Sequence, residues 1–104
     1  MTAASTIGLM SGTSHDGIDA AVVAFEPAPR VVAARTHPFP PELGQALLTV
    51  TSEARPAVQD LMRLDAWLGE AFAEAASGIL RESGLPRNAI QAIGCHGHTL
   101  YHAP

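Results

Sequence analysis

A cluster of glycine, hydroxyl and carboxylate residues near the start of the chain has the composition of a phosphate-binding loop. It lies between two apolar runs and consists of Gly12, Thr13, Ser14, His15, Asp16, Gly17, Ile18 and Asp19. Glycine lets the backbone approach a ligand, and successive N–H groups in a tight turn form a concavity that binds anions. The hydroxyls of Thr13 and Ser14 add donors, and Asp16 or Asp19 would hold Mg²⁺, mostly through water. The cluster therefore predicts a phosphate and magnesium site.

These residue types also occur in plain turns and in hydrolase active sites, and only the first of these alternatives remains open. Gly, Ser and Asp are common in hairpin turns for their backbone preferences alone, so a plain turn remains an open alternative. Ser14, His15 and Asp16 are the residue types of a catalytic triad, but neighbours along a chain cannot pass a proton as a folded triad does. Ser11 stands one place too late for the Gly-x-Ser-x-Gly turn of many hydrolases. Neither pattern is a hydrolase signature.

A second polar cluster follows an apolar run near the end of the chain, at His96, Gly97, His98 and Thr99. In an extended backbone His96 and His98 point the same way, which makes a His-x-His zinc pair conceivable. The pair lacks a clear third ligand, and Gly97 indicates that the strand has ended and that a ligand comes close. Zinc binding, polar contacts to a small molecule and a structural role all remain open.

The elements that must position these clusters form an α/β pattern. Apolar and β-branched runs bounded by turn residues predict strands at residues 7–10, 18–25 and 30–39, joined by short turns into an antiparallel meander. We expect the first two strands to pair antiparallel around the polar loop. A fourth strand is predicted at residues 89–95, reached by a crossover over one sheet face.

Two helices are predicted between the third and fourth strands. Pro41 suits a first helical turn, and that helix is expected to end near Ser52. The second covers residues 57–83 and stops at Gly84 before a proline. Its apolar stripe has three- and four-residue steps and comprises Val58, Leu61, Leu64, Leu68, Phe72, Ala75 and Ile79.

Composition narrows the possible functions. The chain has 104 residues, 47% of them hydrophobic and 15% charged, which predicts one folded domain. All six basic residues are Arg without a cluster, and the net charge of -4 argues against nucleic acid and anionic membranes as partners. A Walker-type loop needs a Lys, so that class is excluded.

The single cysteine, the N-terminal residues and the lack of a long apolar run bear on the cellular location. Cys95 is the single cysteine, so no internal disulfide forms, and its apolar run predicts a buried thiol. The first six residues lack the basic and apolar regions of a signal peptide, and no window reaches the roughly 20 apolar residues of a membrane span. A cytoplasmic location is the expectation.

The two polar clusters together resemble one known family. Residues 7–21 closely resemble the N-terminal signature of anhydro-N-acetylmuramic acid kinases. Residues 93–104 resemble the family's second motif, in which His-Gly-Gln-Thr leads into His-Ala-Pro. The chain departs from the family pattern at His98, where Gln is usual, and at His15, where Leu or Met is usual.

The resemblance implies the fold group of sugar kinases, actin and the heat-shock ATPases, an actin-like or ribonuclease H-like half-domain with strand order 3-2-1-4-5. It implies that residues 1–104 are the single, incomplete N-terminal part of such a kinase domain. It also implies that ATP and Mg²⁺ are used to phosphorylate O6 of 1,6-anhydro-N-acetylmuramic acid, while water opens the anhydro ring during cell-wall recycling. The full-length form could then be a homodimer.

Roles for individual residues follow from the same resemblance. Residues 12–19 would bind the ATP phosphates, with Asp16 and Asp19 orienting magnesium, and residues 96–99 would border the sugar. The catalytic Asp and the adenine pocket are expected outside this chain, so the isolated chain should be inactive. The alternatives are a truncated nucleotide-binding remnant without catalysis and, more weakly, a metal-dependent hydrolase using His96 and His98.

Overall fold

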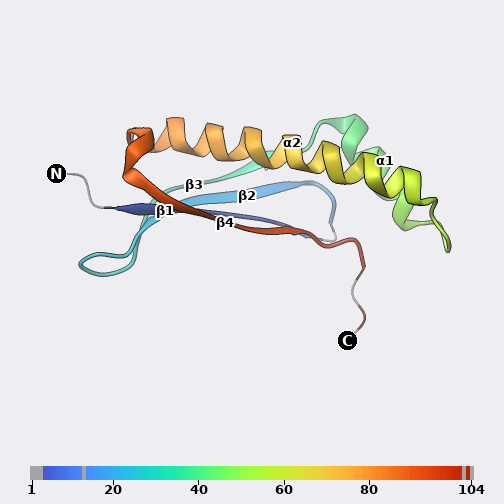
Figure 1. Ribbon diagram of the computed structural model, residues 1–104, viewed down its shortest axis with the longest axis horizontal. Helices are drawn as coiled ribbons and strands as arrows, with labels where there is room; N and C mark the ends of the chain where they lie inside the picture. The colour runs from blue at the N-terminus through green and yellow to red at the C-terminus, as the bar shows by residue number, and fades with distance from the viewer. Residues whose placement is uncertain (1–3, 13, 102, 104) are drawn as a thin grey trace.

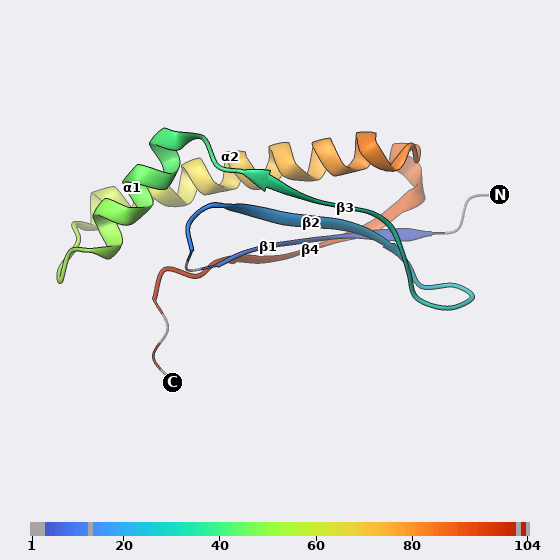
Figure 2. The ribbon, with the colours of Figure 1, turned by 180° about the vertical axis from the view of Figure 1, so that it is seen from behind.

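The computed structural model describes residues 4–12, 14–101 and 103, which form one mixed sheet with helices against one face (Figure 1). In chain order the elements are β1 (Ser5–Ser11), β2 (Gly17–Ala24), β3 (Arg30–Pro38), α1 (Pro41–Thr51), α2 (Val58–Ser83), a 3-10 turn (Arg87–Ala89) and β4 (Ile90–His98). Both helices lie on the same side in the two opposite views, so the other face of the described sheet is bare (Figure 2). No helix in these ranges is long and apolar enough to span a membrane.

The strand order is β3-β2-β1-β4, and the predicted meander is confirmed. β1 and β2 pair antiparallel from Ser5 opposite Ala24 to Met10 opposite Asp19, and β3 pairs antiparallel with β2. β4 pairs parallel with β1. A parallel pair cannot be joined by a hairpin, and α1 and α2 form the required crossover. The order agrees with the first four positions of the 3-2-1-4-5 arrangement expected from the family resemblance.

Both predicted helices are present, and their ends follow from local chemistry. Pro41 occupies the first turn of α1, where its missing N–H has no intrahelical partner to lose. Gly84 ends α2 in the left-handed conformation, with φ 72°. The expected apolar stripe is wrong at Val58, whose side chain is 71% exposed. The first turn of α2 extends beyond the end of the sheet (Figure 1).

β4 is longer than the predicted strand at residues 89–95. Ala89 belongs to the 3-10 turn, and pairing with β1 continues to His98 opposite Ser11 after a shift of register. The expectation of a buried Cys95 is also wrong, because its side chain is exposed. Cys95 pairs with the buried Leu9, but it lies on an outer strand that α2 covers only in part.

The hydrophobic core lies between α1, α2 and the inner strands. Alternate residues of β1 and β2 point toward the helices, as the period of a strand requires. The buried cluster consists of Ile7, Leu9, Ile18, Ala20, Val22, Phe39, Leu43, Leu47, Val50, Leu64, Phe72, Ala75 and Ile79. One core therefore fixes the sheet against both helices, and the chain has the predicted α/β fold.

Neighbouring leucines of α1 provide a test of this packing. Leu47 is 0% exposed and Leu48 is 53% exposed. We expect Leu47→Ala to lower the free energy of unfolding by about 2–5 kcal/mol, since it leaves a cavity in the core. Leu48→Ala is the control and should change it by no more than about 0.5 kcal/mol. Urea unfolding of both variants measures the difference, and equal losses would contradict the described core.

Candidate functional site

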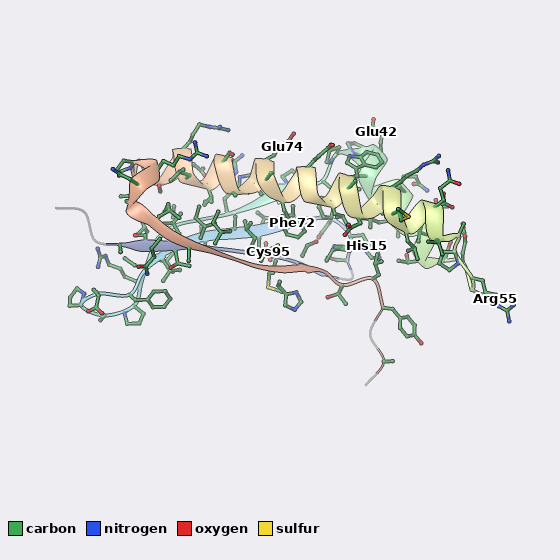
Figure 3. All side chains as sticks on the ribbon, viewed as in Figure 1. His15, Glu42, Arg55, Phe72, Glu74 and Cys95 are labelled. Atoms are coloured by element: carbon green, nitrogen blue, oxygen red, sulfur yellow. The ribbon has the colours of Figure 1, made fainter. Side chains whose placement is uncertain are left out.

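The two polar clusters found in the sequence meet at one end of the sheet. Parallel strands have their carboxyl ends at the same edge, so the ends of β1 and β4 lie side by side. Ser11, the last residue of β1, is paired with His98, the last residue of β4. Figure 3 shows His15 at this end of the sheet, between the helices and the end of β4. Residues separated by more than eighty positions thus share one site.

The β1–β2 loop is a tight turn held at several points. The His15 N–H donates to the Gly12 carbonyl at 3.2 Å, and His15 has φ 55°, in the left-handed region. The Ser14 hydroxyl donates to Asp16 Oδ1 at 2.7 Å. The Phe39 N–H, just after β3, donates to the Asp16 carbonyl at 3.0 Å. The predicted phosphate residue Thr13 lies outside the described residues.

A chain of polar side chains connects this loop to β4 and α1. Ser11 Oγ lies 2.6 Å from His98 Nδ1, and His98 Nε2 lies 2.7 Å from His15 Nδ1. His15 Nε2 faces Thr51 Oγ1 of α1 at 3.5 Å. The edge of Phe39 packs against the His98 ring, with centroids 5.7 Å apart. These contacts join β1, the loop, β4 and α1 at a single point.

The protonation of His98 depends on its surroundings. Burial, followed by the nearby His15 ring, lowers the pKa of His98 from its ordinary value of 6.5. A neutral His98 satisfies both of its contacts, because one ring nitrogen donates and the other accepts. If the rings of His15 and His98 each carried two protons, both facing nitrogens would be donors and the hydrogen bond between them could not form. The two contacts of His98 are therefore both satisfied when its ring is neutral.

The two carboxylates assigned to magnesium lie in different surroundings. Asp16 belongs to the loop, whereas Asp19 lies on β2 and accepts a hydrogen bond from Thr36 Oγ1 at 2.7 Å. Asp19 and His96 line a shallow hollow on the bare face of the sheet, floored by small residues of all four strands. Ser11, His15 and His98 lie on the helix side. The structure thus separates the predicted site residues into two groups.

Exposed carboxylates of this kind suit magnesium better than zinc. Asp16 and Asp19 are both exposed. Within the described ranges, no group of three or more His, Cys, Asp or Glu side chains could hold a metal ion. Mg²⁺ keeps several waters and binds through one or two carboxylates, so it does not require such a group.

The His-x-His pair does not have the geometry that a zinc pair requires. Gly97 has φ 82°, which breaks the extended backbone on which that interpretation depends. His98 turns to Ser11 and His15, while His96 is exposed and lines the hollow on the other face. Thr99 follows the strand and is half-buried. The two histidines therefore serve different faces of the sheet.

Two of the predicted loop residues have clear packing roles. A Cβ at Gly17 would lie 2.7 Å from the His37 carbonyl oxygen, so glycine allows β2 and β3 to approach at the start of their pairing. Ile18 is 1% exposed and its side chain points into the core. For Gly17 and Ile18, only backbone groups are left to face a ligand.

Sequence reasoning did not assign Ser11, Thr51 or Phe39 to the site. Ser11 ends an alternating strand directly before the loop, and this position was the one available signal. Thr51 and Phe39 reach the site through the helix crossover and the β3 pairing. Such tertiary placements leave no local pattern in the sequence.

A strand-loop-strand hairpin beside a parallel strand, in the order β3-β2-β1-β4 with helices crossing over, is part of the half-domain shared by sugar kinases and actin-like ATPases. The family model described as anhydro-N-acetylmuramic acid kinase matches residues 4–104. The chain belongs to this family.

Curated relatives agree with this assignment. The anhydro-N-acetylmuramic acid kinase of Xanthomonas campestris pv. campestris (strain 8004) is 47% identical over 103 residues. Those of Shewanella amazonensis and Vibrio vulnificus are 41% and 40% identical over 99 residues. Each alignment covers 94% of this chain and 27% of the relative, so the chain spans about a quarter of the length of these proteins.

The lowered pKa of His98 predicts a pH dependence of stability. The unfolded chain binds more protons than the folded chain between pH 6.5 and the lower folded pKa. This contribution is therefore fully present above pH 6.5 and is lost as the pH falls through the folded pKa. As the pH is lowered from about 7.5 to about 5.5, the urea concentration at the unfolding midpoint should fall. The fall should be smaller in His98→Gln, because glutamine does not titrate in this range. An equal fall in both proteins would contradict this explanation.

Proposed function

We propose that this chain supplies the ATP phosphate-binding part of a kinase acting on 1,6-anhydro-N-acetylmuramic acid. The observation that supports it most is the β1–β2 loop, where a closed turn of backbone groups, the Ser14 hydroxyl and the Asp16 carboxylate lie beside the polar end of β4. Membership of the kinase family supports the use of ATP and a sugar as small-molecule substrates. The complete activity requires groups beyond this chain, which covers 27% of its relatives.

Each part of the loop has a role in this proposal. The backbone of Gly12 and Gly17 and the hydroxyls of Thr13 and Ser14 contact the phosphates. Asp16 would hold Mg²⁺ through its waters, and Asp19, on β2 after the loop, would contribute a second carboxylate. Mg²⁺ held there would neutralise charge on the phosphates. The positioning of the phosphates is the contribution of this chain.

The end of β4 borders the sugar in the same proposal. Residues 96–99 offer imidazole, hydroxyl and backbone groups that can bind sugar hydroxyls. Water adds at the anomeric carbon and gives its proton to a base outside this chain, and the bond between C1 and O6 breaks. The freed O6 takes the γ-phosphoryl group of ATP, and ADP is the leaving group. The product is N-acetylmuramic acid 6-phosphate. Use of cellular ATP for a recycled cell-wall sugar gives the cytoplasm as the proposed location.

The 104-residue chain alone should not turn over substrate. Phosphoryl transfer requires both substrates to be positioned, and the proposed water-activating group and adenine pocket lie outside this segment. We expect ATP consumption at the background rate when the pure chain is mixed with Mg²⁺, ATP and 1,6-anhydro-N-acetylmuramic acid. Turnover above background would show that a catalytic group has been missed within these residues.

A chimeric enzyme tests the role of Asp16. Residues 4–104 would replace the matching segment of the Xanthomonas campestris relative, to which the chain is 47% identical. Asp16→Asn keeps the shape and removes the charge, so kcat should fall about 100-fold with little change in KM for the sugar.

The matched control in the chimera is Asp65→Asn, an exposed carboxylate on α2 outside the loop. It should leave kcat unchanged. If the unmodified chimera is active and Asp16→Asn is as active as the control, the magnesium role of Asp16 is wrong. If the chimera binds Mg²⁺ and ATP but never phosphorylates the sugar, a nucleotide-binding remnant is the better description.

A further inference from the structure

His15 has a backbone conformation that its surroundings must maintain. Its φ of 55° lies in the left-handed region, which is uncommon for residues other than glycine and costs free energy. The 3.2 Å bond from its N–H to the Gly12 carbonyl closes the turn but fixes only the backbone. Among the residues that the structure describes, the side chain has one close partner, His98 Nε2 at 2.7 Å, and a longer contact to Thr51.

His98 is in turn fixed on three sides. Its Nδ1 bonds to Ser11 Oγ at 2.6 Å, and Ser11 is 3% exposed at the end of β1. Phe39 packs edge-on against the ring. Gly97, with φ 82°, turns the backbone so that the ring reaches the helix side of the sheet. The end of β1, the residue after β3 and the backbone of β4 therefore hold His98 in place independently of its contact with the loop.

We propose that His98 and His15 form a latch in which the end of β4 holds the β1–β2 loop in its closed turn. His98 is a positioning residue that acts through His15 on Gly12 and residues 14–16. The latch couples the two halves of the site, because whatever displaces the end of β4 also releases the loop, and a ligand that fixes one favours the other. The effect on nucleotide rests on the function proposed above, whereas the latch itself is a property of the free chain.

Two substitutions of nearly equal size separate the two contacts of His98. The amide of Gln lies one bond further from the backbone than the amide of Asn, so His98→Gln can replace Nε2 and retain the bond to His15. His98→Asn can replace Nδ1 and retain the bond to Ser11 but does not reach His15. Both remove the ring, so packing against Phe39 is lost equally.

Amide hydrogen exchange of the free chain is the primary measurement. The His15 N–H is protected by Gly12 and the Phe39 N–H by Asp16, so both report opening of the loop without any ligand. We expect His98→Asn to speed exchange at both amides about fivefold, as loss of one net hydrogen bond predicts. His98→Gln should stay near the wild-type rate. Cys95→Ser, an exposed change on the same strand, is the control.

A double-mutant cycle tests whether the effect passes through His15. In a His15→Leu background the loop is expected to be released already, so His98→Asn and His98→Gln, which lose the packing against Phe39 equally, should give the same Phe39 exchange rate. A difference between His98→Asn and His98→Gln in this background, or equal exchange rates in His98→Asn and Cys95→Ser, would overturn the latch.

Binding of Mg²⁺ with ATP is the second measurement, on the same variants. If the loop binds phosphates, His98→Asn should raise the dissociation constant about three- to tenfold, with His98→Gln close to wild type. If the wild-type chain binds no nucleotide at high ligand concentration, the proposed phosphate role of the loop fails. The exchange measurement still decides the latch in that case, so the two failures are distinguishable.

Discussion

The parallel pairing of β1 with β4 determines where every polar group of the site can lie. Antiparallel neighbours would leave the loop after β1 and the cluster after β4 at opposite ends of the sheet. Because the strands run in the same direction, Ser11 and His98 end side by side, and their hydrogen bond at 2.6 Å secures the register after the shift near Gly97. The crossover through α1 and α2 is the topological requirement of that pairing, and the same crossover brings Thr51 to the loop.

Most of the fold could be read from the sequence, because it depends on local signals. Turn residues bound the strands, Pro41 and Gly84 delimit the helices, and period-two and helical stripes give the buried faces. The predictions that were wrong concern the exposure of two side chains at the ends or edges of the elements. Val58 continues the helical stripe and Cys95 lies in an apolar run, but both side chains are exposed. Periodicity tells which way a side chain points and cannot tell whether anything covers it.

The site was predictable only as two separate clusters. Sequence spacing gave the loop and the histidines after the fourth strand, and the family resemblance identified His15 and His98 as unusual. That these two unusual residues touch could not be inferred from positions so far apart along the chain. The opposite orientation of His96 depends on one backbone angle, φ 82° at Gly97, which a pattern of residue types does not encode. In the folded chain each imidazole supplies the other's hydrogen-bond partner.

The exposed outer side of β4 has a consequence for the chain in solution. In the described sheet β4 is hydrogen-bonded to β1 alone, and Ile93 is 57% exposed on this edge. A strand with a free row of N–H and C=O groups and an apolar side chain is a template for addition of another strand. Any segment that completes this sheet therefore also acts as a shield against self-association.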